Sequence, residues 1–115
     1  MRTFADARAL WRDRRQGLLT TNLVLGETWT FLRRRVGHHV ARTFVELAEQ
    51  STRLTIHRVD EATEREAWEW LRRHDERVYS FVDATSFAVM RRLGVLEVLA
   101  FDGDFSAAGF VEVRP

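Results

Sequence analysis

The fold is decided by residues 18–37, which read LLTTNLVLGETWTFLRRRVG. Residues 18–20 at its start predict a short strand. A helix follows at once, because Thr21 or Asn22 provides a side-chain cap and apolar residues then recur at helical spacing. These apolar residues are Leu25, Trp29, Leu32 and Val36, and Gly37 ends the helix. The stretch therefore predicts a strand that leads directly into a helix.

The same alternation of helix and strand continues on both sides of this stretch. Before it, residues 3–16 show a helical apolar period that Gly17 closes. After it, the predicted helices are 38–50, 60–74, 81–93 and 104–108, and the predicted strands are 54–59, 98–101 and 110–113. Strands separated by helices of this length form a parallel sheet with helices on both faces. A chain of 115 residues has room for one such core, so we predict a single α/β domain over residues 1–115.

Residue usage excludes several classes of chemistry. All 18 basic residues are Arg, so the chain has no amine for Schiff-base catalysis and no Walker A lysine. The absence of Cys removes thiol nucleophiles, disulfides and thiolate metal sites. The four His residues lack metal-ligand spacing beyond one adjacent pair, and we interpret them as structural or solvated. A metal would therefore be held mainly by carboxylates.

The formal net charge of +1 argues against a protein whose affinity comes from neutralising many phosphates at once. The Arg residues still gather in groups within the predicted helices, at positions 12–15, 33–35, 72–73 and 91–92. Such groups are either solvated helix surface or phosphate contacts, and both interpretations stay open. No apolar run approaches a membrane span, and the N-terminus lacks the apolar stretch of a signal peptide. We therefore expect a cytoplasmic protein without a membrane segment.

Three acids occupy positions where a solvated carboxylate is not expected. Glu27 has an apolar residue one helical turn away on either side, and Asp83 shares a helix face with Phe87. Asp102 follows a predicted strand at its carboxyl end, with Asp104 two residues further on. In open α/β sheets that end is where ligands bind. Because burying an unpaired carboxylate is costly, each acid needs a partner.

Each acid also has a purely structural interpretation. Ser80 and Asp83 have the spacing of a capping box, and Asp104 can cap the helix after the turn that begins at Asp102. Glu27 can favour the dipole of its helix from the first turn. Taken together, however, the acids lie on the strand-carboxyl side of the predicted sheet. Such a group can bind Mg²⁺ or Mn²⁺ through a few carboxylates and several waters.

Three segments resemble the acidic motifs of one family. They are TTNLVLGET at 20–28, SFVDATS at 80–86 and AFDGDF at 100–105. They resemble the second, third and fourth motifs of PIN-domain ribonucleases, specifically the VapC-type toxins of prokaryotic toxin–antitoxin pairs. The resemblance covers essentially the whole chain and implies a three-layer PIN-like fold. It also implies that Glu27, Asp83 and Asp102 are the catalytic acids that hold the metal, with Asp104 as a further ligand.

One part of the family pattern is missing from the chain. The family begins with a strand that ends in an acidic motif, whereas residues 1–16 correspond to the helix before the second strand. We therefore expect this strand and its Asp to be absent, which removes the ladder partner between the strands at 18–20 and 98–101. The exposed gap predicts a homo-oligomer that covers it.

The resemblance implies a toxin-type, metal-dependent endoribonuclease. Its substrate would be RNA, its cofactor Mg²⁺ (or Mn²⁺), and its partner a cognate antitoxin. The bound ion would activate a water for attack on the phosphodiester, so no nucleophilic side chain is needed. The absence of the first acid predicts weakened activity. The alternative is a non-catalytic, degenerate PIN-like module that dimerises or binds an antitoxin.

Overall fold

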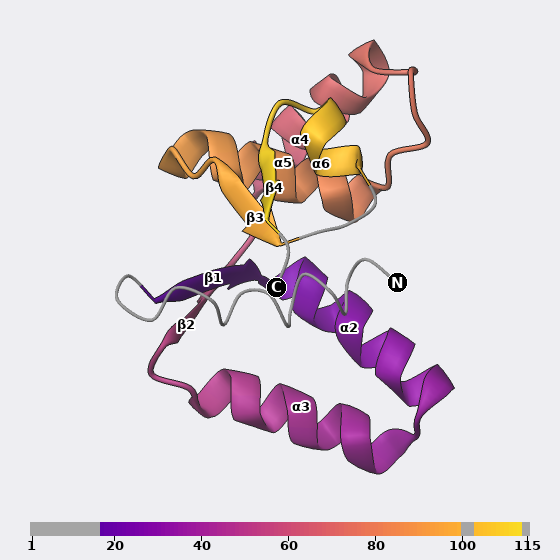
Figure 1. Cartoon of the computed structure of the whole chain (residues 1–115), viewed down its shortest axis with the longest axis vertical. Coiled ribbons are helices and arrows are strands. Elements are labelled where there is room, and N and C mark those ends of the chain that lie inside the picture. Colours follow the sequence, from indigo (N-terminus) through magenta and orange to yellow (C-terminus); the bar gives the residue numbers. More distant parts are fainter. Residues whose placement is uncertain (1–16, 100–102, 114–115) are drawn as a thin grey trace.

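The structure, a computed structural model, describes residues 17–99 and 103–113 (Figure 1). The helix predicted at 3–16, the end of the strand predicted at 98–101 and the predicted site residue Asp102 lie outside these ranges. The elements in chain order are β1 (Leu18–Thr21), α2 (Asn22–Arg35), α3 (His38–Gln50), β2 (Leu54–His57), α4 (Glu61–Arg73), α5 (Phe81–Leu93), β3 (Glu97–Leu99), α6 (Asp104–Ala107) and β4 (Val111–Val113). Each element predicted within the described residues is therefore present.

All of the strand pairing in the described residues is parallel, as predicted for an α/β fold. β1 pairs with β2, with Leu18 opposite Leu54, and β3 pairs with β4, with Glu97 opposite Val111. The ladder is divided into these two pairs, so β1 and β3 are each an end strand within the part of the chain that the structure describes. The break in the sheet lies between β1 and β3, the two strands for which the sequence predicts a missing strand between them.

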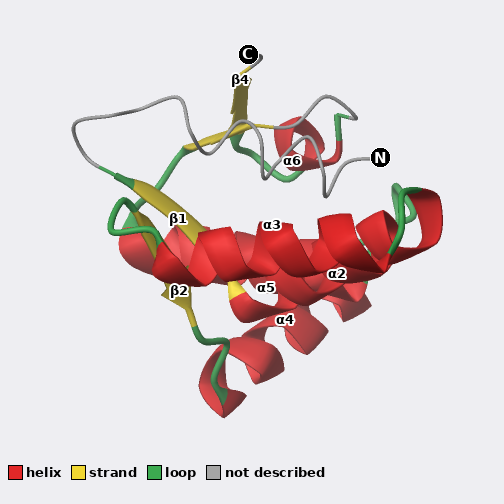
Figure 2. Ribbon diagram, turned by 90° about the horizontal axis from the view of Figure 1, so that it is seen from below, coloured by secondary structure: helices red, strands yellow, loops and turns green. Residues whose placement is uncertain are grey.

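The junction between β1 and α2 is fixed by a helix cap. Thr21 ends β1 in extended conformation, and its hydroxyl accepts a hydrogen bond from the Val24 amide at 3.1 Å. A cap of this kind satisfies one of the unpaired amides at a helix start. Gly37, at φ 138°, then separates α2 from α3, and the two helices run side by side in opposite directions (Figures 1 and 2).

The core is built around one aromatic ring on α5. Phe87 is fully buried, and its ring contacts those of Trp70, Tyr79, Phe105 and Phe110 at centroid distances of 4.8–5.8 Å. These rings come from α4, the loop after it, α6 and the residue just before β4. Truncating such a buried Phe costs about 3–5 kcal/mol. The cluster therefore fixes α6 against α5, which carry Asp104 and Asp83.

None of the helices within residues 17–99 and 103–113 is long and apolar enough to cross a membrane.

Candidate functional site

Asp83 lies at the start of α5 and belongs to a capping box, as its spacing from Ser80 predicts. The Ser80 hydroxyl accepts a hydrogen bond from the Asp83 amide at 3.0 Å, and the Asp83 carboxylate accepts one from the Ser80 amide at 3.4 Å. Asp83 is also buried, with 3% of its surface exposed. A capping carboxylate on a surface helix is normally solvated, so burial distinguishes this one. Asp83 therefore combines the structural role with the position expected of a site residue.

Asp104 lies in the first turn of α6 and is also buried, at 9% exposure. The interpretation of Asp104 as the helix cap is wrong, because the N-cap residue is Gly103, in left-handed conformation at φ 83°, and no side chain caps the helix from that position. The Asp104 carboxylate instead accepts a hydrogen bond from Arg77 Nε at 2.8 Å. Asp104 is therefore held by a cation 27 residues earlier in the chain.

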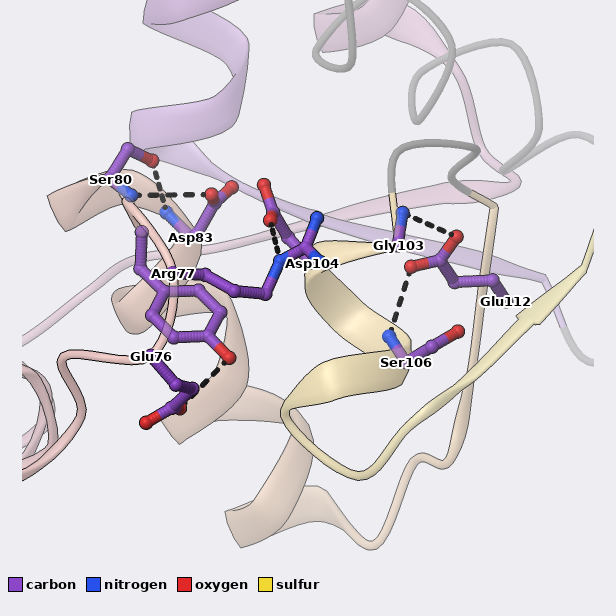
Figure 3. A network of polar contacts seen from close by, with 9 residues as sticks. Glu76, Arg77, Ser80, Asp83, Gly103, Asp104, Ser106 and Glu112 are labelled. Atoms are coloured by element: carbon purple, nitrogen blue, oxygen red, sulfur yellow. Dashed lines mark hydrogen bonds and ion pairs between the residues drawn. The ribbon is translucent and has the colours of Figure 1, made fainter.

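The start of α6 is held from β4 by Glu112. Its Oε1 accepts a hydrogen bond from the Gly103 amide at 3.2 Å, and its Oε2 accepts one from the Ser106 amide at 2.9 Å (Figure 3). One carboxylate thereby satisfies two amides at the start of a helix whose N-cap residue, Gly103, has no side chain to cap it. Glu112 thus fixes the backbone that carries Asp104.

Arg77 is the site residue that sequence reasoning missed. In Figure 3 the side chains of Asp83 and Asp104 point toward one another, and the Arg77 guanidinium lies beside Asp104. The guanidinium also lies near Gly103, where an added Cβ would stand 3.5 Å from one of its nitrogens. Arg77 comes from the loop between α4 and α5, outside every Arg group that the helical pattern singled out. Its position six residues before Asp83 is the one sequence signal that could have drawn attention to it.

The loop that carries Arg77 is anchored on both sides. Tyr79 is buried in the aromatic cluster, and its hydroxyl donates to Glu76 Oε2 at 3.1 Å. Burial, together with this hydrogen bond, raises the pKa of Tyr79 above its ordinary value of 10.0. A hydrogen bond from its own backbone, helped by those from Tyr79 and His74, lowers the pKa of Glu76. The loop therefore has a defined conformation next to the acids.

Glu27 lies on α2, half-buried, in the second turn of the helix. The first turn of α2 contains no acid, so the interpretation of Glu27 as a first-turn dipole contact is wrong. Among residues 17–99 and 103–113, no three His, Cys, Asp or Glu side chains form a group that could hold a metal ion. Because Asp102 is outside those residues, the convergence of Glu27, Asp83 and Asp102 stays a prediction.

The two described carboxylates nevertheless fit a hard cation. Asp83 and Asp104 are both buried and point toward one another, and like charges in that position need a positive group between or beside them. Their donor atoms are all oxygens, which Mg²⁺ and Mn²⁺ prefer. The pair therefore offers only oxygen ligands, with the Arg77 guanidinium next to Asp104.

Three comparisons relate this chain to known proteins. The model of the family described as PIN domain matches residues 2–111. The chain is 58% identical over 113 residues to proteins named 23S rRNA-specific endonuclease VapC20 from two strains of Mycobacterium tuberculosis, CDC 1551 / Oshkosh and H37Rv, covering 95% of this chain and 82% of each relative.

A solved structure gives the same relationship. The crystal structure of Mycobacterium tuberculosis VapC20, described as a Sarcin-Ricin loop cleaving toxin, matches at a TM-score of 0.86 and 55% identity, over 97% of this chain and 85% of that one. These findings confirm the predicted fold class and the predicted class of activity, an endoribonuclease of the toxin type.

Proposed function

Because the chain belongs to the PIN-domain family, we propose that it is a toxin endoribonuclease whose substrate is 23S rRNA. The observation that carries the proposal is the 58% identity, over 95% of this chain, to relatives named for that activity. The matched region covers 95% of this chain and so includes the segments that hold Asp83 and Asp104. This identity favours the nuclease over the alternative of a non-catalytic module.

Dependence on a divalent metal is general among nucleases of this family, and we propose Mg²⁺ or Mn²⁺ as the ion. Asp83 and Asp104 are the described residues that would hold it, and we propose Glu27 and Asp102 as the others. A bound ion supplies an activated water and stabilises charge on the phosphate during hydrolysis. The all-oxygen donor set and the burial of both carboxylates support this assignment.

The chain's own residues position the reaction and do not take part covalently. The Ser80 hydroxyl accepts a hydrogen bond from the Asp83 amide, and the aromatic cluster fixes α5 against α6, so the two carboxylates keep their orientation. Glu112 fixes the backbone of Asp104 from β4. Such preorganisation is where enzymes without a covalent nucleophile gain most of their rate.

Toxins of the VapC type act on RNA and pair with antitoxins, and we propose both for this chain. We also propose that it acts in the cytoplasm, where ribosomal RNA is found. The end strands β1 and β3, each with one described partner, support a homo-oligomer that covers their open edges. A single monomeric species in sedimentation at micromolar concentration would contradict that part of the proposal.

The substrate is tested by incubating the protein with purified ribosomes in Mg²⁺ and separating the rRNA on denaturing gels. We expect 23S rRNA to yield two discrete fragments while 16S rRNA stays intact, and we expect EDTA to prevent the cut. Equal degradation of both rRNAs would contradict the proposed substrate. Intact 23S rRNA at every enzyme concentration would contradict the activity itself.

A further inference from the structure

We propose that Arg77 binds a phosphate of the RNA substrate next to the buried carboxylates. This inference rests on the proposed function and assigns a role within it to a residue from a loop. The observation behind it is the placement of a partly exposed guanidinium beside two buried acids, by a loop that is anchored at both ends.

The site needs a positively charged side chain that can contact a phosphate of the substrate. Asp83 and Asp104 present negative charge to a phosphodiester that is itself negative, and like charges at short range repel strongly. Arg77 is the cationic side chain that the described residues place in contact with Asp104. A guanidinium is the side chain best suited to phosphate oxygens, because its donors form a rigid fork.

The exposure of the Arg77 side chain distinguishes a phosphate-binding residue from one that serves only a buried ion pair. Its side chain is 42% exposed, whereas that of its partner Asp104 is 12% exposed. The contact with Asp104 is made through Nε, so it orients the guanidinium, which lies near Gly103. Because Asp104 is mostly buried and the Arg77 side chain is partly exposed, a phosphate can approach Arg77 from solvent.

The anchored loop makes Arg77 a preorganised contact. The His74 ring stacks on Trp70 at 4.0 Å before Arg77, and Tyr79 packs into the aromatic cluster after it. The Tyr79 amide also donates to the Arg77 carbonyl at 3.0 Å, which tightens the turn between them. A contact whose loop is already ordered loses less conformational entropy when the ligand binds.

Arg92 provides a matched control. Its Nε donates to Glu66 Oε2 at 2.8 Å, the same distance as in the Arg77–Asp104 pair, and its side chain is 43% exposed against 42% for Arg77, while its partner Glu66 is more exposed than Asp104. Arg92 lies in the last turn of α5, nine residues after Asp83, which is about 13 Å along the helix axis. Removing either side chain changes the net charge equally, so a difference between the variants reports position.

The experiment measures binding without metal, so that the result does not depend on turnover. A fluorescently labelled RNA hairpin with the sarcin–ricin loop sequence is titrated in EDTA against wild type, Arg77→Ala, Arg77→Lys and Arg92→Ala, at several salt concentrations. We expect Arg77→Ala to bind about tenfold more weakly. Its dependence of log K on log salt should be shallower by about 0.7, the value for one lost phosphate contact on single-stranded RNA.

The conservative variant tests whether the positive charge at position 77 carries the binding. Arg77→Lys keeps the charge, so it should recover the salt slope and part of the affinity, while Arg92→Ala should bind within twofold of wild type. Thermal melts check that each variant is folded. Equal binding by folded Arg77→Ala and wild type would overturn the inference, as would an equal loss in Arg92→Ala. If wild type neither binds RNA nor cleaves ribosomes, the proposed function falls and this inference with it.

Discussion

Replacing Glu112 should loosen the backbone that carries Asp104. The side chain lies on β4 and accepts hydrogen bonds from the amides of Gly103 and Ser106 at 3.2 and 2.9 Å. The variant Glu112→Ala loses both of these bonds to the start of α6. The residue itself has no place in the proposed chemistry, so an effect on cleavage would have to act through the position of Asp104.

The magnitude follows from the two hydrogen bonds. A bond to a charged group contributes about 1.5–3 kcal/mol, and water can replace part of it because Glu112 is only half-buried. We therefore expect Glu112→Ala to lower the free energy of unfolding by about 2 kcal/mol, which for a domain of this size lowers Tm by about 6–10 °C. The variant Glu112→Gln keeps one acceptor oxygen and should lose about half as much.

The assay pairs thermal melts with ribosome cleavage, and Glu97→Ala serves as the control. Glu97 is an exposed acid on β3, the strand that pairs with β4, and its removal should change stability by less than about 0.5 kcal/mol. We expect cleavage by Glu112→Ala to fall at least about tenfold while Glu97→Ala cleaves as wild type does. If Glu112→Ala has the same melting temperature as Glu97→Ala and cleaves normally, the start of α6 does not depend on the hydrogen bonds to Glu112.

Three further perturbations test the surroundings of the site. Ser80→Ala removes the cap of α5 and should cost about 1 kcal/mol, measured as a Tm lower by about 3–5 °C; an unchanged Tm would mean that the capping box contributes nothing. Gly103→Ala places a side chain at φ 83° and should lower the free energy of unfolding in urea by about 1–2 kcal/mol; an unchanged value would contradict the need for a left-handed residue there. Tyr79 is the one tyrosine of the chain, so tyrosinate absorbance reports it alone, and its midpoint should lie above 10.0 in the folded protein and return to about 10 in urea. Because the folded pKa of Tyr79 is raised, its contribution to stability is complete below pH 10 and is lost as the pH rises through the folded pKa. The pKa of Glu76 is lowered, so its contribution is present above pH 4.5 and is lost as the pH falls through the folded pKa. Tyr79→Phe should weaken the pH dependence of stability in both ranges, and identical pH profiles for the variant and wild type would contradict this.

The parts of the fold that local sequence determines were predictable. The bounds of α3 and α5 agree with the predicted helices 38–50 and 81–93. Gly37 and Ser80 are the N-cap residues at which these helices begin, and Gly94 is the C-cap residue of α5. Gly94 takes the left-handed conformation that ends many helices. The burial of Asp83 also followed from its place on an apolar helix face. Where one residue and its near neighbours decide a structure, the sequence pattern is sufficient.

The contacts that complete the site could not be predicted in this way. Arg77 meets Asp104 across 27 residues, and Glu112 reaches back to Gly103 across nine. Neither Arg77 nor Glu112 belongs to a periodic pattern, since one lies in a loop and the other on a strand of three residues. Their partners are set by how α6 packs on the aromatic cluster around Phe87, which is a property of the tertiary structure.

The cleavage rate of Asp83→Asn on ribosomes in Mg²⁺ tests directly whether this buried carboxylate belongs to the active site. The amide oxygen of Asn can still accept the hydrogen bond from the Ser80 amide, so the capping box survives while the negative charge is lost. Asp75→Asn, at an exposed acid of the loop before Arg77, is the matched control. We predict that Asp83→Asn keeps its melting temperature within a few degrees and cleaves 23S rRNA at least about 100-fold more slowly, while Asp75→Asn cleaves normally. A folded Asp83→Asn that cuts 23S rRNA at the wild-type rate would contradict the assignment of this buried carboxylate to the active site.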